Sequence, residues 1–100
     1  MANCKVEFNV KAPSKEVYLV GSVEALGNWD VKKAIKLTYI EETETFTVSK
    51  MLPVGEYIEY KLLAGKDWTL SEKGIWMEEL GNRSFTANKK EVVEVIVSNF

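Results

Sequence analysis

Hydrophobic and polar residues alternate along much of this chain of 100 residues, as they do in half-buried β-strands. The clearest case is residues 6–10, where Val6, Phe8 and Val10 share one face and a turn follows at Pro13. We expect further short strands at residues 17–20, 35–38, 45–48, 57–63, 92–97 and around Phe85. Only residues 24–26 could form a helical turn. The pattern therefore predicts an all-β sandwich or barrel rather than alternating strands and helices.

All three tryptophans lie in the two segments that lack a strand pattern, residues 21–33 and 64–82. A tryptophan of the core normally occupies the apolar phase of a strand or helix, whereas Trp29, Trp68 and Trp76 do not. For a single one of them, folding back to cap an open end of the sandwich is as good an explanation as binding. For the three together the pattern favours a binding surface, because loops at one end of a sandwich commonly form one.

An exposed indole suits one class of ligand in particular. A glucose ring of an α-glucan presents a nearly apolar face of C–H bonds, and its hydroxyl groups lie around the rim. Stacking that face on indole removes apolar area from water, and amide or charged side chains nearby can bind the hydroxyl groups. With so few contacts we expect modest affinity, about −4 to −8 kcal/mol, which is millimolar to micromolar.

Composition excludes several other classes of function. The length fits one domain, residues 1–100, with neither repeat nor linker. Basic residues are scattered and the formal charge is −2, so we expect no nucleic-acid partner, and no apolar run is long enough to cross a membrane. There is no histidine, and Cys4 is the single cysteine, so neither an internal disulfide nor a cysteine-based zinc site can form. We predict no metal, no cofactor and no nucleophilic role for Cys4, which has no imidazole to activate it.

Five short motifs, in order, resemble those of the family 20 carbohydrate-binding modules, the starch-binding domains. They cover about residues 4–98 of the chain and comprise Val17-Tyr18-Leu19-Val20-Gly21-Ser22, Leu26-Gly27-Asn28-Trp29-Asp30, Ala34-Ile35-Lys36-Leu37, Leu52-Pro53-Val54-Gly55-Glu56 with Ile58-Glu59-Tyr60-Lys61, and Asn82-Arg83-Ser84-Phe85-Thr86. The resemblance implies an immunoglobulin-like antiparallel β-sandwich of seven to eight strands. It also implies non-catalytic binding of α-1,4-glucans such as starch, glycogen, maltooligosaccharides and cyclodextrins. We expect a monomer that targets an attached or associated enzyme to polysaccharide, with the catalytic domain absent from this chain.

The resemblance also assigns roles to individual residues. Trp29 matches the stacking tryptophan of the family site, and Lys61 and Asn82 match the residues that hydrogen-bond sugar hydroxyl groups. From the residues alone, Lys61 would be a solvated lysine on a strand face and Asn82 a turn residue. The second stacking tryptophan departs from the family pattern, because a residue separates Trp76 from the nearest glutamate, Glu78.

Two questions about the site stay open at this point. Trp76 is favoured as the second wall, but Trp68 lies seven residues after Lys61, a spacing similar to that of the glycogen-binding modules of AMP-activated kinase β subunits. Both indoles could also contribute. Glu78 is preferred over Glu79 as the site glutamate. Tyr39 is a candidate for a weak second site.

Two other functions compete with this interpretation. A regulatory glycogen-sensing domain would also dock on a protein partner, for which Ile40, Met51 and Phe100 are candidate apolar contacts. A hydrolase would need paired carboxylates such as Glu78 and Glu79, but adjacent side chains on a strand point to opposite faces and a small sandwich has no deep cleft. Localisation depends on context: extracellular if the chain comes from a secreted enzyme, cytoplasmic if it is complete.

Overall fold

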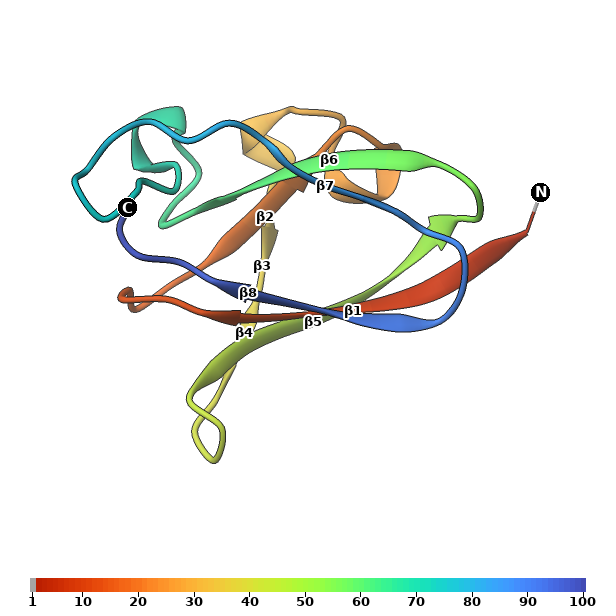
Figure 1. Ribbon diagram of the computed structural model, residues 1–100, viewed down its shortest axis with the longest axis horizontal. Helices are drawn as coiled ribbons and strands as arrows, with labels where there is room; N and C mark the ends of the chain where they lie inside the picture. Colours follow the sequence, from red (N-terminus) through yellow and green to blue (C-terminus); the bar gives the residue numbers. More distant parts are fainter. Residues whose placement is uncertain (1) are drawn as a thin grey trace.

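The first sheet forms around the N-terminal strand β1, whose alternating side chains bury Val6, Phe8 and Val10 completely. The computed structural model describes residues 2–100 and places this strand second from one edge, in the order β4-β5-β1-β8 (Figure 1). The strands of this sheet are β1 (Asn3–Lys11), β4 (Thr38–Ile40), β5 (Thr45–Pro53) and β8 (Glu91–Ile96).

The second sheet has the order β3-β2-β6-β7. Its longest strand confirms the predicted alternation, because Ile58, Tyr60 and Leu62 point into the core while Glu59 and Lys61 point away from it. The strands are β2 (Tyr18–Gly21), β3 (Ile35–Lys36), β6 (Tyr57–Leu63) and β7 (Arg83–Thr86).

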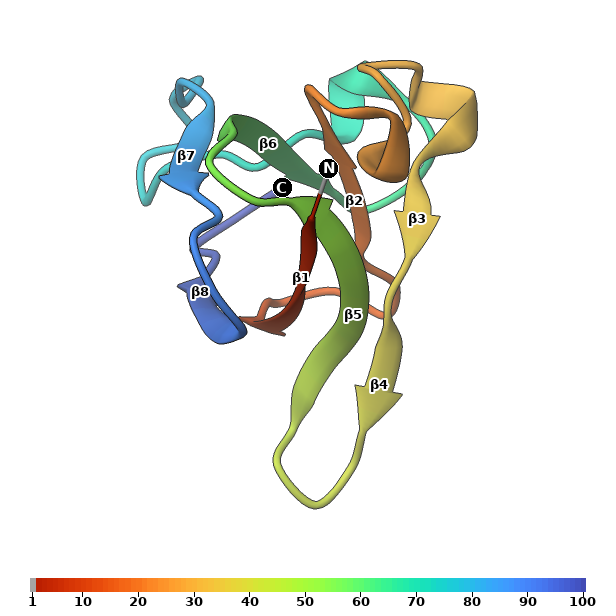
Figure 2. The same cartoon turned by 90° about the vertical axis from the view of Figure 1, so that its right-hand side faces the viewer.

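The two sheets face each other as the two layers of a sandwich, seen edge-on in Figure 2. Phe8 from the first sheet meets Tyr60 and Phe85 from the second in edge-to-face contacts, with ring centroids 5.5 Å and 5.8 Å from its own. This aromatic cluster joins the layers at the middle of the core.

Three short 3₁₀ turns complete the structure, and one of them, η1, is the single turn expected at residues 24–26. Turns η2 and η3 lie on the side of the second sheet that faces away from the first sheet (Figures 1 and 2). The turns are η1 (Glu24–Leu26), η2 (Val31–Lys33) and η3 (Trp68–Leu70).

For residues 2–100 the structure thus confirms an all-β sandwich, with eight strands. Five of its six strand pairings are antiparallel, and the sixth, between β1 and β8, is parallel. Within residues 2–100, no helix is long and apolar enough to span a bilayer.

We expect Phe8→Ala to lower the free energy of unfolding by about 3–5 kcal/mol, because it leaves a cavity where the two sheets meet. Urea unfolding followed by tryptophan fluorescence measures this change. The matched control is Val92→Ala on the exposed outer face of β8, which we expect to change stability by less than about 0.5 kcal/mol. Equal effects of the two substitutions would contradict this placement of the core.

Candidate functional site

The second sheet carries apolar side chains on its outer face as well as its inner face. Val20 on β2 and Leu63 on β6 point away from the main core, yet both are fully buried. They form a small separate cluster with Ala34, and Tyr18, Trp29 and Val31 pack against it. The loop that carries Trp29 therefore covers this outer patch.

Three consecutive residues in that loop adopt the left-handed backbone conformation. The φ angles are +88° at Gly27, +50° at Asn28 and +63° at Trp29. Glycine and asparagine tolerate this region, whereas for a bulky side chain it is an outlier of the kind that clusters at functional sites. The Trp29 N–H donates to the Gly21 carbonyl at 2.9 Å, which ties the strained residue to the end of β2. The indole of Trp29 is thereby fixed, half-buried, on the apolar patch.

Trp68 lies beside Trp29. The two ring centroids are 6.2 Å apart and the ring planes are inclined by 44°. Trp68 opens turn η3 and keeps 42% of its surface exposed. Asp67 caps this turn, since its Oδ1 accepts hydrogen bonds from the Thr69 N–H at 2.8 Å and the Thr69 hydroxyl at 2.7 Å. Both bonds hold the pKa of the Asp67 carboxyl below its usual value, and the bond from the hydroxyl contributes more than the bond from the backbone N–H.

Lys61 lies on the same outer face as the tryptophan pair. It is directly opposite Val20 in the β2–β6 ladder, and Val20 belongs to the cluster that supports Trp29. Its Nζ donates to the Leu80 carbonyl oxygen at 2.7 Å. An ammonium group has three donors, so this bond leaves two of them for a ligand.

Asn82 comes immediately before β7. The last pair of the β6–β7 ladder is Tyr60 with Arg83, so the same register continued by one residue places Asn82 opposite Lys61. Asn82 is exposed. The register therefore brings Lys61 and Asn82 to one end of the outer face.

An ion pair that the sequence analysis did not anticipate fixes this end of β7. Arg83 donates from Nε and Nη2 to the two carboxylate oxygens of Glu72, at 2.9 Å and 2.6 Å, and from Nη2 to the Ile96 carbonyl at 3.1 Å. The hydrogen bonds to Glu72, whose side chain is buried, raise the pKa of the Arg83 guanidinium. Arg83 belongs to the Asn-Arg motif, but nothing in the local sequence identifies Glu72 as its partner.

The favoured second wall, Trp76, lies on a different loop from Trp68. Its indole is 84% exposed. Among the aromatic ring pairs within residues 2–100, Trp29 is paired with Trp68 and not with Trp76. Glu78 accepts the Trp76 N–H through Oε1 at 2.9 Å, while Glu79 lies 3.6 Å from the Lys73 ammonium. The two glutamates thus bind different groups.

Tyr39 belongs to the other sheet, on strand β4, away from the tryptophan pair. Its ring is about half exposed and lies against Phe46, with centroids 4.9 Å apart. A shallow groove passes beside it, lined by Ala12, Ser14, Lys15, Tyr39, Glu44 and Phe46.

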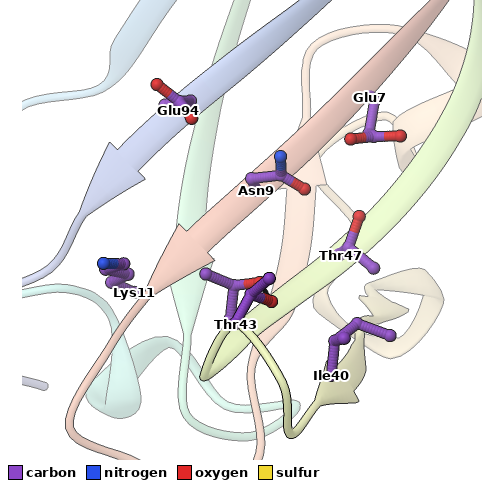
Figure 3. A pocket seen from close by; sticks show the side chains of 8 residues that line it. Glu7, Asn9, Lys11, Ile40, Thr43, Thr47 and Glu94 are labelled. Carbon is purple, nitrogen blue, oxygen red and sulfur yellow. Dashed lines mark hydrogen bonds between the residues drawn. The ribbon is translucent and has the colours of Figure 1, made fainter.

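A wider open groove of 590 Å³ lies on the outer face of the first sheet, between β1, β4, β5 and β8 (Figure 3). Its walls are polar or aliphatic and include no aromatic ring: Glu7, Asn9, Lys11, Ile40, Thr43, Thr45, Thr47 and Glu94. It offers no surface on which a sugar ring could stack. Within residues 2–100, no group of three or more histidine, cysteine or acidic side chains could hold a metal ion.

Comparison with known proteins identifies the family. The sequence profile of the starch binding domain family matches residues 3–97. The chain belongs to the starch binding domain family. This confirms the resemblance and makes the chain a non-catalytic carbohydrate-binding module, and it favours this interpretation over the regulatory alternative.

The relatives of this starch binding domain include much longer proteins. It is 38% identical over 79 residues to a cyclomaltodextrin glucanotransferase of Bacillus sp. (strain 17-1). This alignment covers 76% of this chain and 10% of the glucanotransferase. It is 35% identical over 87 residues to glucoamylase-1 of Arthroderma benhamiae, covering 81% of this chain and 13% of the relative. The chain therefore spans about a tenth of the length of these relatives.

Solved structures agree with the fold of the domain. The family 20 module of a maltotetraose-forming amylase from Pseudomonas saccharophila STB07 aligns with a TM-score of 0.57 and 28% identity, over 88% of this chain and 98% of that one. A family 15 glucoamylase from Hypocrea jecorina aligns with a TM-score of 0.80 at 20% identity, over 99% of this chain and 18% of that one. The second similarity shows the fold alone.

The cap of the Trp68 turn predicts a measurable titration. Thr69→Val removes the hydroxyl hydrogen bond that contributes most to the lowered pKa of Asp67, so we expect this pKa to rise towards its usual value. Because the folded-state pKa is lowered, the cap stabilises the turn above the unfolded-state pKa and this stabilisation is lost as the pH falls through the folded-state pKa. An NMR pH titration of the Asp67 carboxyl carbon tests the shift. Thr69→Ser, which keeps the hydroxyl, is the control, and an unchanged pKa in Thr69→Val would contradict the assignment.

Proposed function

We propose that this starch binding domain holds α-glucan on the outer face of its second sheet, with Trp29 and Trp68 as the central stacking surface. The observation that carries the proposal is the fixed pair of tilted indoles, 6.2 Å apart. One of the two is held in a strained left-handed conformation on an apolar patch. Strain at an aromatic residue that is not needed for the main core supports a binding role.

The tilt between the rings suits a curved ligand. The α-1,4 linkage makes a glucan chain bend, so the apolar faces of successive glucose units are inclined to one another. Two indoles at 44° can each cover one such face, whereas a straight, flat chain would favour coplanar rings. Covering apolar area in this way contributes about 25 cal/mol per Å² without removing the sugar hydroxyl groups from their partners.

Lys61 and Asn82 would supply the hydrogen bonds. The register of β6 and β7 brings both residues to the same end of the outer face. The Lys61 ammonium also keeps donors free beyond its bond to the Leu80 carbonyl. We assign them to the 2- and 3-hydroxyl groups of a glucose unit bound on the indoles. Since these contacts are at the surface, the affinity should be modest.

Trp76 would add a further stacking contact on the neighbouring loop. The ring geometry supports Trp68 rather than Trp76 as the immediate companion of Trp29, and both indoles would contribute to binding. Tyr39, on the first sheet, would form at most a weak second site, because the ring beside it, Phe46, is buried and only Tyr39 is open to a sugar.

The domain would serve to hold a starch-active enzyme on its polymer. The relatives include a glucanotransferase and a glucoamylase, of each of which this domain matches about a tenth. Glu78 binds a backbone N–H and Glu79 lies beside Lys73, so the two carboxylates have different partners, whereas a catalytic pair flanks one bond. The domain thus contributes binding and the attached enzyme the chemistry.

We expect Trp29→Ala to weaken maltoheptaose binding about 30-fold, since the apolar area that one ring covers is worth about 2 kcal/mol. For Trp68→Ala we expect about tenfold weaker binding. Isothermal titration calorimetry measures both effects, with reducing-sugar release followed in parallel and expected to be absent.

Ile96→Ala is the matched control, because it removes a large side chain that is 75% exposed on the outer face of the other sheet. Wild-type affinity in a folded Trp29→Ala variant would refute the proposed surface. Unchanged affinity in Trp68→Ala would show that the tilted pair does not act together, and release of reducing sugar would show that the domain is an enzyme.

A further inference from the structure

The loop that carries Trp76 presents three large apolar side chains in succession to solvent. Ile75 is 69% exposed, Trp76 84% and Met77 56%. Within residues 2–100, none of the three belongs to either buried apolar cluster, so we attribute the shape of this tip mainly to polar contacts. Two backbone hydrogen bonds close the turn, from the Gly74 N–H to the Glu78 carbonyl and from the Met77 N–H to the Gly74 carbonyl, both 2.9 Å long. Met77 at the corner has a left-handed φ of +63°.

Glu78 folds back into this turn instead of pointing away from it. Its Oε1 accepts a hydrogen bond from the backbone N–H of Trp76 at 2.9 Å. The carboxyl group lies directly against the α-carbon of Gly74, where a Cβ would overlap Cδ and both carboxylate oxygens. A side chain at position 74 would therefore displace the Glu78 carboxylate from this place. One carboxylate oxygen of Glu78 is thus used within the loop.

Asn99, from a distant part of the chain, forms hydrogen bonds with the other side of the turn. Its Nδ2 donates to the Gly74 carbonyl at 3.0 Å and to the Ile75 carbonyl at 3.4 Å. Its own carbonyl accepts the Lys73 N–H at 2.8 Å, so backbone and side chain bind adjacent residues of one loop. Asn99 and Glu78 thus satisfy the polar groups on both sides of the tip.

We propose that Glu78 and Asn99 are positioning residues that hold the Trp76 indole ready to stack on α-glucan. This inference rests on the proposed function and deepens it, because it makes neither residue a sugar ligand. An ordered loop loses less conformational entropy on binding than a loose one, so the two side chains act on affinity through Trp76. Their effect should vanish when Trp76 is absent.

A double-mutant cycle tests this dependence. We expect Trp76→Ala, Glu78→Ala and Asn99→Ala each to weaken maltoheptaose binding about three- to tenfold. In the Trp76→Ala background, neither Glu78→Ala nor Asn99→Ala should weaken binding further. Glu78→Gln keeps a carbonyl oxygen for the Trp76 N–H and should bind within about twofold of wild type. Amide hydrogen exchange at Trp76 should accelerate in Glu78→Ala and not in Glu78→Gln.

Controls separate this inference from the function on which it rests. Glu42→Ala and Asn88→Ala remove the same side-chain types from exposed positions elsewhere and should leave affinity unchanged. Should Asn99→Ala fail to fold, the Glu78 arm on the exposed loop decides the question. The inference is wrong if Glu78→Ala weakens binding equally with and without Trp76, since Glu78 would then contact sugar directly. It is also wrong if Trp76→Ala binds like wild type while Trp29→Ala does not, whereas unchanged binding in Trp29→Ala removes the proposed function itself.

Discussion

The two central strands of the second sheet bury apolar side chains on both faces, and the rest of the site follows from this constraint. Leu19 and Leu62 point into the main core, while Val20 and Leu63 point the other way and still have no exposed surface. A sheet with one face in water would normally place polar side chains there. Burying Val20 and Leu63 requires a cover, and loop residues around Trp29 provide it. The aromatic surface is therefore a consequence of how the sandwich completes its burial.

Covering the patch with a tryptophan imposes a backbone cost. The chain passes through three consecutive left-handed residues between Gly27 and Trp29, and the Gly21 carbonyl holds the last of them. Conformations of this kind persist where the surroundings determine them strongly, as the packing on Val20 and Leu63 does here. Because the indole is both strained and supported, it stays in place before any ligand arrives. Rigid aromatic side chains bind with little loss of entropy.

Polar contacts perform the corresponding task for the surrounding loops. Asp67 caps the turn of Trp68, the Arg83–Glu72 pair fixes the start of β7 next to Asn82, and Asn99 with Glu78 shapes the loop of Trp76. Each of these contacts joins a loop to a neighbouring residue or to a distant strand. These contacts determine where the aromatic groups and hydrogen-bonding groups lie. The sandwich supplies a rigid base, and these contacts supply the arrangement upon it.

The alternation of apolar residues along the chain was enough to locate the strands and to leave the three tryptophans in loops, because side-chain direction in a strand has a fixed period of two. Trp29, Lys61 and Asn82 could be named from the sequence since they belong to short motifs in order. The companion of Trp29 could not be decided in this way. Whether Trp68 or Trp76 lies beside it depends on how two loops far apart in the chain pack together on the outer face of the second sheet. The sequence by itself determined which aromatic residues lie outside the strand pattern, and only the tertiary structure decided which of them lie side by side, because the packing of two loops distant in the chain depends on contacts between them.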